Sequence, residues 1–488
     1  MNESNPILKL HFDNPQNTGI LKRYNCLGKD SSLTSETTII YYGLLEDGII
    51  KDISFRAFGC SYSIAASSFI TTLAKNKNFL LAAKISKNDI EKKLGEFPAS
   101  KKDSLNIAVG AFYNMLSFYM PDLIKNKLYP EEENKIAVAM SGGIDSSMAA
   151  KILKDKSFDL IGITMKIIPD DILPSKKRIT SWMTTDVESA RRVCDILDIP
   201  HLVIDLSDNF EEKIIEPFCN AYLEGKTPNP CVECNRLIKF GLLLQNCRSL
   251  GAKYIATGHY CQVEKDNKSQ AFIVRKGSDS LKDQSYIFWK LDQSRLMHIK
   301  TPIGAFTKEQ IKEKSGDLLS FLEEKKESQD ICFIAEDRYQ NFLNKRSGEI
   351  KKGRILNKKG EYIGDHHGFP YYTIGQRKGL GISHSRPLYV KKIIPEKNQI
   401  IVGEMEELIQ NHAYLENINF ISGKPPSKEF TADVKIRYSS PGVSAKIVLD
   451  EDNKAIVYFK KKVSSITPGQ SAVFYDGNTL LGGGIIIG

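Results

Sequence analysis

The segment KIAVAMSGGIDSSMAAKIL (135–153) constrains the fold of this chain more than any other. KIAVAM is a short apolar run typical of a strand, SGG is a tight turn, and the residues after it have the pattern of a helix. Further strand-like runs follow at 158–165, 201–206 and 253–258, with helical patterns between them. Because strands that alternate with helices pair in parallel, we expect a parallel α/β sheet whose faces are covered.

The turn after the first strand has the composition of an anion site. Gly142 and Gly143 allow close approach of the backbone to phosphate oxygens, and the helix N-terminus after them favours negative charge. Ser141 and Ser146 offer hydroxyl donors, and Asp145 is a candidate ligand for Mg²⁺. The spacing is not that of a Walker A loop. SGGxDS instead resembles the pyrophosphate-loop (PP-loop) ATPases, which cut ATP between the α and β phosphates; the alternative is a simple helix cap.

Three cysteines form a second candidate site. Cys231 and Cys234 lie in TPNPCVECNR, where two prolines predict a non-helical approach to a helix that begins near Asn235, and Cys332 lies in SQDICFI. Three thiols leave several chemistries open. One is a structural zinc site, although no fourth ligand is evident. Another is a redox pair in which the helix N-terminus lowers the pKa of Cys234. The last is a sulfur-handling site that uses a persulfide or a three-cysteine iron–sulfur cluster; inert buried thiols are the remaining alternative.

Patterns outside the central region predict two further kinds of architecture. Before residue 130, a hairpin around Asp47-Gly48 and helical patterns at 61–74 and 105–119 indicate a small α+β unit. Proline and a short acidic run at 130–134 separate it from the differently patterned region that follows. From about residue 345, short strand-like segments, YYTIGQRKG among them, predict a small β linking domain and a C-terminal β-barrel. The expected domains are therefore 1–130, 134–344, 345–405 and 406–488.

Composition excludes several classes of protein. The 488 residues include nine cysteines, too few for a disulfide scaffold, so we expect a reducing cytoplasm. No apolar stretch is long enough for a membrane helix, and the N-terminus MNESNPILKL lacks the pattern of a signal peptide. The net charge of +9 permits a polyanionic partner without requiring one.

From about residue 135 to the end, the chain resembles the tRNA-specific 2-thiouridylase (MnmA) family. The resemblance rests on SGGIDSS, TPNPCVECNRLIKFG, YIATGHY, KDQSY, SQDICFI, YTIGQRKGLGI, VKIRY and TPGQSAVFYDG, which occur in this order. It implies a tRNA-uridine 2-sulfurtransferase. Such an enzyme adenylates the C2 oxygen of the wobble uridine in tRNA anticodons of the Lys, Glu and Gln type, then transfers sulfur to give 2-thiouridine, AMP and pyrophosphate. ATP and Mg²⁺ are the implied cofactors, and tRNA is the implied partner.

The resemblance also implies roles for individual residues. Cys234 matches the nucleophile and Cys332 the persulfide-bearing cysteine, while Cys231 stands where some relatives carry Asp. Two mechanisms remain open: either Cys234 resolves a persulfide on Cys332 into a disulfide, or all three cysteines bind a [4Fe–4S] cluster whose free iron holds sulfide. The implied ATP-binding positions are Ala139, Met140, Ser141, Gly142, Gly143, Ile144, Asp145, Ser146, Met165 and Gly258. The implied tRNA-binding positions are Asn229, Pro230, Cys231, Lys282, Asp283, Gln284, Arg437 and Tyr438.

The N-terminal unit, residues 7–126, resembles the iron–sulfur scaffold family NifU/IscU through FDNPQNTG and DGIIKDISFRAFGCSYSIAASS. That family uses three cysteines, but here only Cys60 remains, with Thr34 and Ser104 at the other two positions and Asp103 where a histidine is usual. Hydroxyls are poor substitutes for thiolates on iron, so cluster assembly is not expected. The unit either docks a cysteine desulfurase or sulfur-relay protein, with Cys60 as a sulfur relay, or is structural.

Two other functions compete with tRNA thiolation. One is a different PP-loop ligase acting on a small acid, and the other is a non-enzymatic carrier of iron–sulfur clusters or sulfur. We expect no membrane partner, and the resemblance implies a monomer on tRNA.

Overall fold

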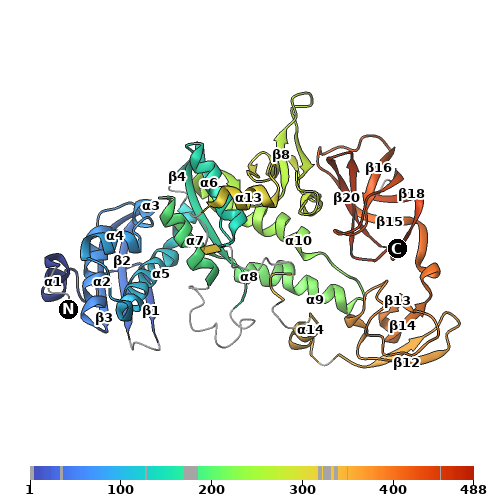
Figure 1. Cartoon of the computed structure of the whole chain (residues 1–488), viewed down its shortest axis with the longest axis horizontal. Helices are drawn as coiled ribbons and strands as arrows, with labels where there is room; N and C mark the ends of the chain where they lie inside the picture. Colours follow the sequence, from blue (N-terminus) through green and yellow to red (C-terminus); the bar gives the residue numbers. More distant parts are fainter. Residues whose placement is uncertain are drawn as a thin grey trace.

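The computed structural model describes residues 5–32, 37–126, 129–169, 185–316, 321–322, 331–334, 339–348, 350–450 and 452–487. The molecule is elongated: the N-terminal unit lies at one end, a central α/β region follows, and two β domains lie at the other end (Figure 1). Within the described ranges, every helix is too short or too polar to cross a membrane.

The N-terminal unit is an α+β domain, as expected. Three antiparallel strands in the order β1-β2-β3 pack against helices α2 and α5. The predicted hairpin is confirmed: Asp47 (φ 49°) and Gly48 (φ 71°) are both left-handed, as a type I′ turn requires. The elements are α1 Pro6–Asp13, β1 Cys26–Ser31, β2 Thr38–Glu46, β3 Ile49–Phe58, α2 Ser61–Ala74, α3 Phe79–Ala82, α4 Lys87–Leu94 and α5 Lys102–Asn126.

The central sheet is parallel, which confirms the α/β prediction. Its strand order is β10-β7-β4-β5-β6. From β4, the chain continues to β5 and β6 on one side of the sheet and later to β7 and β10 on the other side. The carboxyl ends of β4 and β7 therefore border the point at which the strand order reverses. Parallel α/β sheets commonly bind ligands at such a switch point. The elements are β4 Tyr129–Ala139, α6 Ile144–Asp155, β5 Asp159–Lys166, α7 Thr185–Ile196, β6 His201–Asp205, β7 Leu250–Ala256, β10 Ile299–Lys300 and α13 Lys308–Ser315.

Residues 130–134, where a boundary between two regions is expected, lie within β4 rather than in a loop. The acidic run is compatible with a strand since its charges are paired. Glu131 contacts Arg248 at 2.7 Å, Glu132 contacts Lys135 at 2.8 Å, and Glu133 pairs with Lys253. The N-terminal unit therefore leads directly into the central strand of the sheet.

Two long helical stretches contain π-helical turns. In the second, the helix begins at Pro230 rather than near Asn235, because proline is well suited to the first position of a helix. Both cysteines of the CVEC motif therefore lie in helical turns. The first stretch is α8 Ser207–Phe210, η3 Glu211–Ile215 and α9 Glu216–Leu223; the second is α10 Pro230–Glu233, η4 Cys234–Leu243 and α11 Leu244–Ser249.

Two β domains end the chain, as predicted. A four-stranded sheet has the order β12-β11-β14-β13, and a barrel is closed by the pairing of β15 with β20. Hairpin β8–β9, from the central region, extends the barrel sheet through the pair Arg275–Thr479. The strands are β8 Cys261–Lys265, β9 Phe272–Lys276, β11 Gly353–Leu356, β12 Tyr362–His366, β13 Tyr389–Ile394, β14 Gln399–Gly403, β15 Ile409–Phe420, β16 Glu429–Lys435, β17 Val443–Leu449, β18 Lys454–Ser464, β19 Ser471–Asp476 and β20 Thr479–Ile486.

The segment YYTIGQRKG is not a strand, contrary to expectation. It follows a short 3-10 turn, η7 Phe369–Tyr371, and runs as a loop to β13. Left-handed glycines at 375 (φ 87°) and 379 (φ 79°) are incompatible with extended strand geometry. The remaining helices are α12 Gln293–Leu296 and α14 Tyr339–Ser347.

Candidate active site

The PP loop lies at the carboxyl end of β4 and leads into α6. Gly142 has a φ of 73°, and an added Cβ there would come within 2.2 Å of the Asp186 carbonyl oxygen, so only glycine fits. The Ser141 amide donates to Ser146 Oγ at 3.2 Å, so this N–H points into the loop rather than outward. Ser146 Oγ in turn donates to the Gly143 carbonyl at 3.0 Å. The loop is thus held in a fixed shape by its own serine.

Asp145, the single acid of the loop, is tightly held. Its Oδ1 accepts hydrogen bonds from Tyr260 Oη at 2.7 Å and from Lys308 Nζ at 2.8 Å. The Lys308 side chain is only 7% exposed, so solvent screens this ion pair weakly. A carboxylate already neutralised by a buried ammonium does not fit the role of a Mg²⁺ ligand in this arrangement.

The other residues predicted to bind nucleotide gather at the same sheet edge. Gly258 follows β7, and a Cβ there would lie 2.7 Å from Asp145 C and Ser146 N, so its backbone packs directly on the loop. Met165 lies near the carboxyl end of β5, the strand that pairs with β4. Its neighbour Lys166 pairs with Asp205 of β6 at 3.2 Å. Ala139 and Met140 end β4 itself, and Ile144 begins α6.

The cysteines of the CVEC motif differ in exposure. Cys231 is exposed in the first helical turn, whereas Cys234 is buried. Burial raises the pKa of Cys234 to about 12, although Lys239 opposes the shift. The expectation that the helix N-terminus lowers this pKa is wrong, because the helix already begins at Pro230 and burial of Cys234 disfavours its thiolate. Cys234 is therefore a protonated thiol at neutral pH in this state.

The three cysteines influence one another but are not arranged as ligands of one ion. The charges of Cys231 and Cys332 both raise the pKa of Cys234. Cys332 is itself exposed, although neighbouring protein atoms still raise its pKa. In the described part of the chain, no three metal-ligating side chains converge on a common point. A three-cysteine cluster does not fit this arrangement, and we derive no chemistry through it.

Lys239 is a cation that the sequence analysis missed. Its charge lowers the pKa of all three cysteines and of His259. Lys239 lies five residues after Cys234 in a π-helical segment, whose i→i+5 hydrogen bonds bring residues five apart onto the same side of the helix. The π-helical register is therefore consistent with the influence of Lys239 on Cys234.

Residues 258–260 connect the loop to the cysteine helix. The ring of His259 lies 6.0 Å from that of Phe240 in η4, and 5.1 Å from that of Phe288. On the other side, Gly258 and Tyr260 contact the PP loop through the packing and hydrogen bond described above. One three-residue segment therefore touches both predicted sites.

The predicted tRNA contacts divide into exposed and structural residues. Tyr438 is 42% exposed. Partial burial and the charges of Asp283 and Cys231 raise the pKa of its hydroxyl, so this residue of the barrel domain lies near the cysteine site. Its ring lies edge-on to Tyr286 at 5.9 Å. Arg437, by contrast, donates to the carbonyls of Ile374 and Ser465 and thereby joins the barrel to the small β domain.

The KDQ turn at 282–284 is mostly engaged in internal hydrogen bonds. Asp283 is buried and accepts from the amides of Gly277 and Ser285 at 3.0 Å each. Gln284 Oε1 accepts from the Tyr260 amide at 2.9 Å. Lys282 is half-buried at the same turn. Asp283 and Gln284 thus hold the turn in place, and their predicted contact with RNA is not tested by this geometry.

Gln470 is a second residue that the sequence analysis missed. Its side-chain amide donates to the Thr227 carbonyl at 2.9 Å, and the Thr227 amide donates to the Pro468 carbonyl at 2.9 Å. Thr227 precedes Asn229 and Pro230, so the barrel fixes the segment that leads into the cysteine helix. The TPGQ motif was the available signal, but a contact between residues 243 positions apart has no local signature.

In the N-terminal unit, two of the scaffold positions meet. Cys60 caps α2, and its sulfur lies 3.1 Å from Ser104 Oγ. Burial raises the pKa of Cys60, but the Ser104 hydroxyl, two backbone amides and Lys101 outweigh it, so the net pKa is lowered. Cys26 is buried, and burial raises its pKa to about 12. Thr34 lies outside the described residues.

Charged residues join this unit to the central domain. Arg191 of α7 is 7% exposed, and its guanidinium stacks on the ring of Tyr113 in α5 at 3.9 Å. Lys84 pairs with Asp198 at 3.8 Å across the same boundary. Helix α7 also begins beside the PP loop, since Asp186 is the residue against which Gly142 packs.

Comparison with known proteins agrees with this layout. Three family models match consecutively: a tRNA methyl transferase HUP domain at 134–336, a tRNA methyl transferase PRC-barrel domain at 340–404 and an aminomethyltransferase beta-barrel domain at 410–486. A NifU-like N terminal domain matches residues 3–122. The four matched ranges correspond to the four parts of the structure.

Relatives and solved structures were also compared. A solved structure of a putative iron–sulfur cluster assembly scaffold protein for the SUF system from Fervidobacterium islandicum AW-1 aligns at 14% identity and a TM-score of 0.21, over 23% of this chain and 95% of that chain. The tRNA-specific 2-thiouridylase MnmA of Clostridium botulinum (strain Alaska E43 / Type E3) is 41% identical over 355 residues, which are 72% of this chain and 98% of the relative. MnmA 2 of Thermoanaerobacter sp. (strain X514) is 44% identical over 360 residues, which are 73% of this chain and 98% of the relative. The chain therefore belongs to the tRNA-specific 2-thiouridylase (MnmA) family and carries a NifU-like domain at its N-terminal end.

Proposed function

We propose that the protein is a tRNA-uridine 2-sulfurtransferase. It uses ATP to adenylate the C2 oxygen of the wobble uridine in tRNA anticodons of the Lys, Glu and Gln type, and then replaces that oxygen with sulfur. The products are 2-thiouridine, AMP and pyrophosphate. Family membership supports the reaction, and the following geometry supports the assignment of residues.

The observation that carries the proposal is the segment 258–260. Gly258 packs on Asp145 and Ser146 of the PP loop, while His259 packs on Phe240 of the cysteine helix. An adenylated uridine must be made and then attacked by sulfur without leaving the enzyme. A loop for ATP and a group of thiols that share one connecting segment meet this requirement.

In the first step, the C2 oxygen attacks the α-phosphorus of ATP. The bond to the bridging oxygen breaks, and pyrophosphate leaves with the bonding electrons. Backbone amides at the start of α6 and the ammonium of Lys166 lie at this sheet edge and suit the developing negative charge. Asp145, held by Lys308 and Tyr260, positions the helix start. Participation of Mg²⁺ remains a prediction.

In the second step, sulfur replaces the activated oxygen. The terminal sulfur of a persulfide on Cys332 attacks C2, the C–O bond breaks, and AMP leaves with the former C2 oxygen. The Cys234 sulfur then attacks the Cys332 sulfur, so the S–S bond of the persulfide breaks and 2-thiouridine is released. Formation of the Cys234–Cys332 disulfide supplies the two electrons that cleave the persulfide bond. A thiol reductant then restores both cysteines to thiols.

Two residues, Asn229 and Pro230, directly precede Cys231 in the sequence, and Tyr438 lies close enough for the charge of Cys231 to affect it. We assign these three residues to binding of the target base. Tyr438 offers an exposed aromatic ring, on which an unstacked base can lie. The role proposed for Lys282, Asp283, Gln284 and Arg437 is to shape the surrounding RNA surface. We also propose that the reaction takes place in the cytoplasm and that one chain acts on one tRNA.

For the NifU-like domain we propose sulfur relay. A cysteine desulfurase or relay protein docks there, Cys60 receives sulfur as a persulfide, and fusion to the catalytic region raises the effective concentration of the donor. The lowered pKa of Cys60 and its contact with Ser104 support a thiolate at this position. We place the domain boundaries at 1–130, 134–344, 345–405 and 406–488.

Mass analysis of tRNA nucleosides from cells that lack the protein tests this function. Loss of 2-thiouridine derivatives, restored by the wild-type gene and not by a Cys234→Ser variant, is the expected result. A different PP-loop ligase or a non-enzymatic carrier would leave a Cys234→Ser strain with normal 2-thiouridine.

A further inference from the structure

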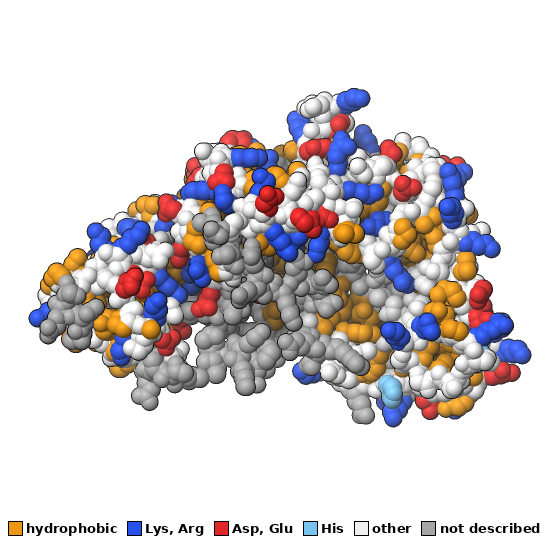
Figure 2. Space-filling view, in the orientation of Figure 1, with side chains coloured by type: hydrophobic (Ala, Val, Ile, Leu, Met, Phe, Trp, Pro, Cys, Tyr) orange, Lys and Arg blue, Asp and Glu red, His pale blue; other side chains and the backbone are white. Residues whose placement is uncertain are grey.

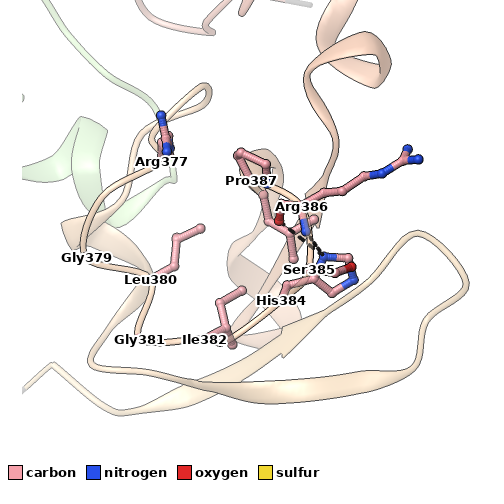
Figure 3. A pocket seen from close by; sticks show the side chains of 10 residues that line it. Arg377, Gly379, Leu380, Gly381, Ile382, His384, Ser385, Arg386 and Pro387 are labelled. Atoms are coloured by element: carbon pink, nitrogen blue, oxygen red, sulfur yellow. Dashed lines mark hydrogen bonds between the residues drawn. The ribbon is translucent and has the colours of Figure 1, made fainter.

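A pocket of about 410 Å³ lies in the small β domain, in the loop that joins η7 to β13 (Figure 3). This volume is within the range of sites for small ligands. The pocket belongs neither to the PP loop nor to the cysteine helix, so the proposed reaction gives it no role. Its lining residues are Arg377, Gly379, Leu380, Gly381, Ile382, His384, Ser385, Arg386, Pro387 and Leu388.

The pocket combines apolar surface with positive charge. Ile382 and Pro387 border the hollow, Leu380 is buried beneath it at 5% exposure, and Arg377 lies at its rim (Figure 3). Arg386 is neutralised by Glu404 at 2.9 Å. Arg377, in contrast, is exposed and has no acidic partner within the described ranges. One uncompensated cation beside apolar side chains suits a ligand that carries both an anion and a flat apolar group.

Backbone donors line the same loop. The amides of Gly375 and Val390, at its two ends, donate to protein carbonyls at 2.8 and 3.0 Å. Between Arg377 and Ser385, no backbone amide donates to a described protein acceptor. Gly379 (φ 79°) and Gly381 (φ 68°) are left-handed, and turns of this kind direct successive N–H groups into a concave site for anions.

The base of this loop is attached to the proposed uridine site. Thr373 Oγ1 accepts from Thr227 Oγ1 at 3.2 Å, and Thr227 lies just before the cysteine helix. The Ile374 carbonyl accepts from Arg437 at 3.2 Å, and Arg437 adjoins Tyr438. The loop that lines the pocket is therefore tied both to the segment before the cysteine helix and to the residue beside Tyr438.

We propose that this pocket binds one nucleotide of the substrate tRNA outside the target uridine, with the phosphate on Arg377 and the loop amides and the base against Ile382 and Pro387. This inference rests on the proposed function, because it takes tRNA as the substrate. A free nucleotide has the same phosphate and base. The attachment of the loop to the uridine site favours a nucleotide that belongs to the bound RNA.

The test compares Arg377→Gln with a matched control, Lys358→Gln. Lys358 belongs to the same domain, pairs with Glu407 at 3.5 Å and does not line the pocket. The dissociation constant of unmodified tRNA is measured without ATP over a series of salt concentrations. Loss of one phosphate contact weakens binding by about eightfold at 0.1 M salt and lowers the salt slope by about 0.9. We expect this change in Arg377→Gln and wild-type values in Lys358→Gln.

Three outcomes would overturn the proposal. Wild-type affinity and salt slope in Arg377→Gln, while the wild type binds tRNA, would reject the pocket alone. The same loss in both variants would show a nonspecific effect of charge. Titration with AMP in the absence of tRNA distinguishes a nucleotide of the tRNA from a free nucleotide. If Arg377→Gln loses AMP binding but keeps tRNA binding, the pocket binds a free nucleotide. Failure of the wild type to bind tRNA would instead contradict the proposed function.

Discussion

The guanidinium of Arg191 lies 3.9 Å from the centre of the Tyr113 ring, and this contact joins the NifU-like domain to the catalytic domain. Arg191 belongs to α7, whose first turn packs on the PP loop at Gly142. The added domain is therefore docked on the helix that borders the proposed ATP site, on the side shown in blue and green in Figure 1.

Replacing Arg191 with Met should destabilise the protein. The change removes the stacked cation and leaves Asp195 and Glu188, which its charge stabilises, with Lys87 as their remaining cation in the described part of the chain. We expect a loss of about 3 kcal/mol in the free energy of unfolding, measured by urea denaturation and circular dichroism. The exposed Lys9→Met is the control, and equal stability of both variants would show that the contact does not hold the domains together.

The same boundary should make stability depend on pH. Burial raises the pKa of Asp30 to about 6 and that of Asp195 to about 7 in the folded protein. Both groups bind protons more tightly when folded, so their contribution is fully present below about pH 4 and is lost as the pH rises through 6 to 7. The melting temperature of the wild type should therefore fall between pH 5 and pH 8, and the melting temperature of Asp195→Asn should fall by a smaller amount over the same range. An identical pH profile for both proteins would refute this assignment.

The ion pair between Asp145 and Lys308 should be required for use of ATP. Lys308→Met leaves the carboxylate without its buried partner and frees the start of α6 to move. We expect pyrophosphate release to fall by about 100-fold, because a small displacement of reacting groups has a large effect on rate. Lys312→Met on the exposed face of the same helix serves as the control. Unchanged pyrophosphate release in Lys308→Met would remove Asp145 and Lys308 from the proposed mechanism.

Lys239 should keep the cysteines reactive. Its charge lowers the pKa of Cys231, Cys234 and Cys332, so Lys239→Met should raise all three and reduce the thiolate fraction at a fixed pH. Alkylation of the exposed Cys231 by iodoacetamide at pH 7.5 should slow by about tenfold, and Lys239→Arg should restore most of the rate. A Lys239→Met protein that reacts as fast as the wild type would show that the charge does not act on these thiols.

Cys60 should react at lower pH than the other thiol of its domain. Its pKa is lowered, whereas that of Cys26 is about 12, so the Cys60 thiolate appears first as the pH rises. Ser104→Ala removes a hydrogen bond to the thiolate and should shift Cys60 labelling, followed by mass spectrometry, to higher pH. If Cys60→Ala supports thiolation at the wild-type rate with a cysteine desulfurase as donor, the relay proposal fails.

Local patterns were sufficient to predict most of the elements. The SGG turn, the period of the central strands and the Asp47-Gly48 hairpin all act over a few residues, and the structure agrees with them. Predictions failed where distant residues decide the outcome. The acidic run at 130–134 forms part of a strand because Arg248 and Lys253 neutralise it from elsewhere in the chain.

The site was harder to predict than the fold for the same reason. Sequence motifs identified Asp145 and Cys234, but not the residues that pack around them or bind them. Lys308 reaches Asp145 over 163 positions, and no local pattern marks that pair. The pKa of Cys234 depends on its burial, which only the packed structure determines. A helix N-terminus alone therefore predicted the wrong direction.

The central claim is that the C2 oxygen of uridine leaves as part of AMP, and isotope transfer tests it most directly. A tRNA with ¹⁸O at C2 of its wobble uridine is incubated with the protein, ATP and a persulfide donor, and AMP is analysed by mass spectrometry. The account predicts one ¹⁸O atom in AMP for each 2-thiouridine formed. Unlabelled AMP, with the ¹⁸O retained in the RNA or released to water, would contradict it.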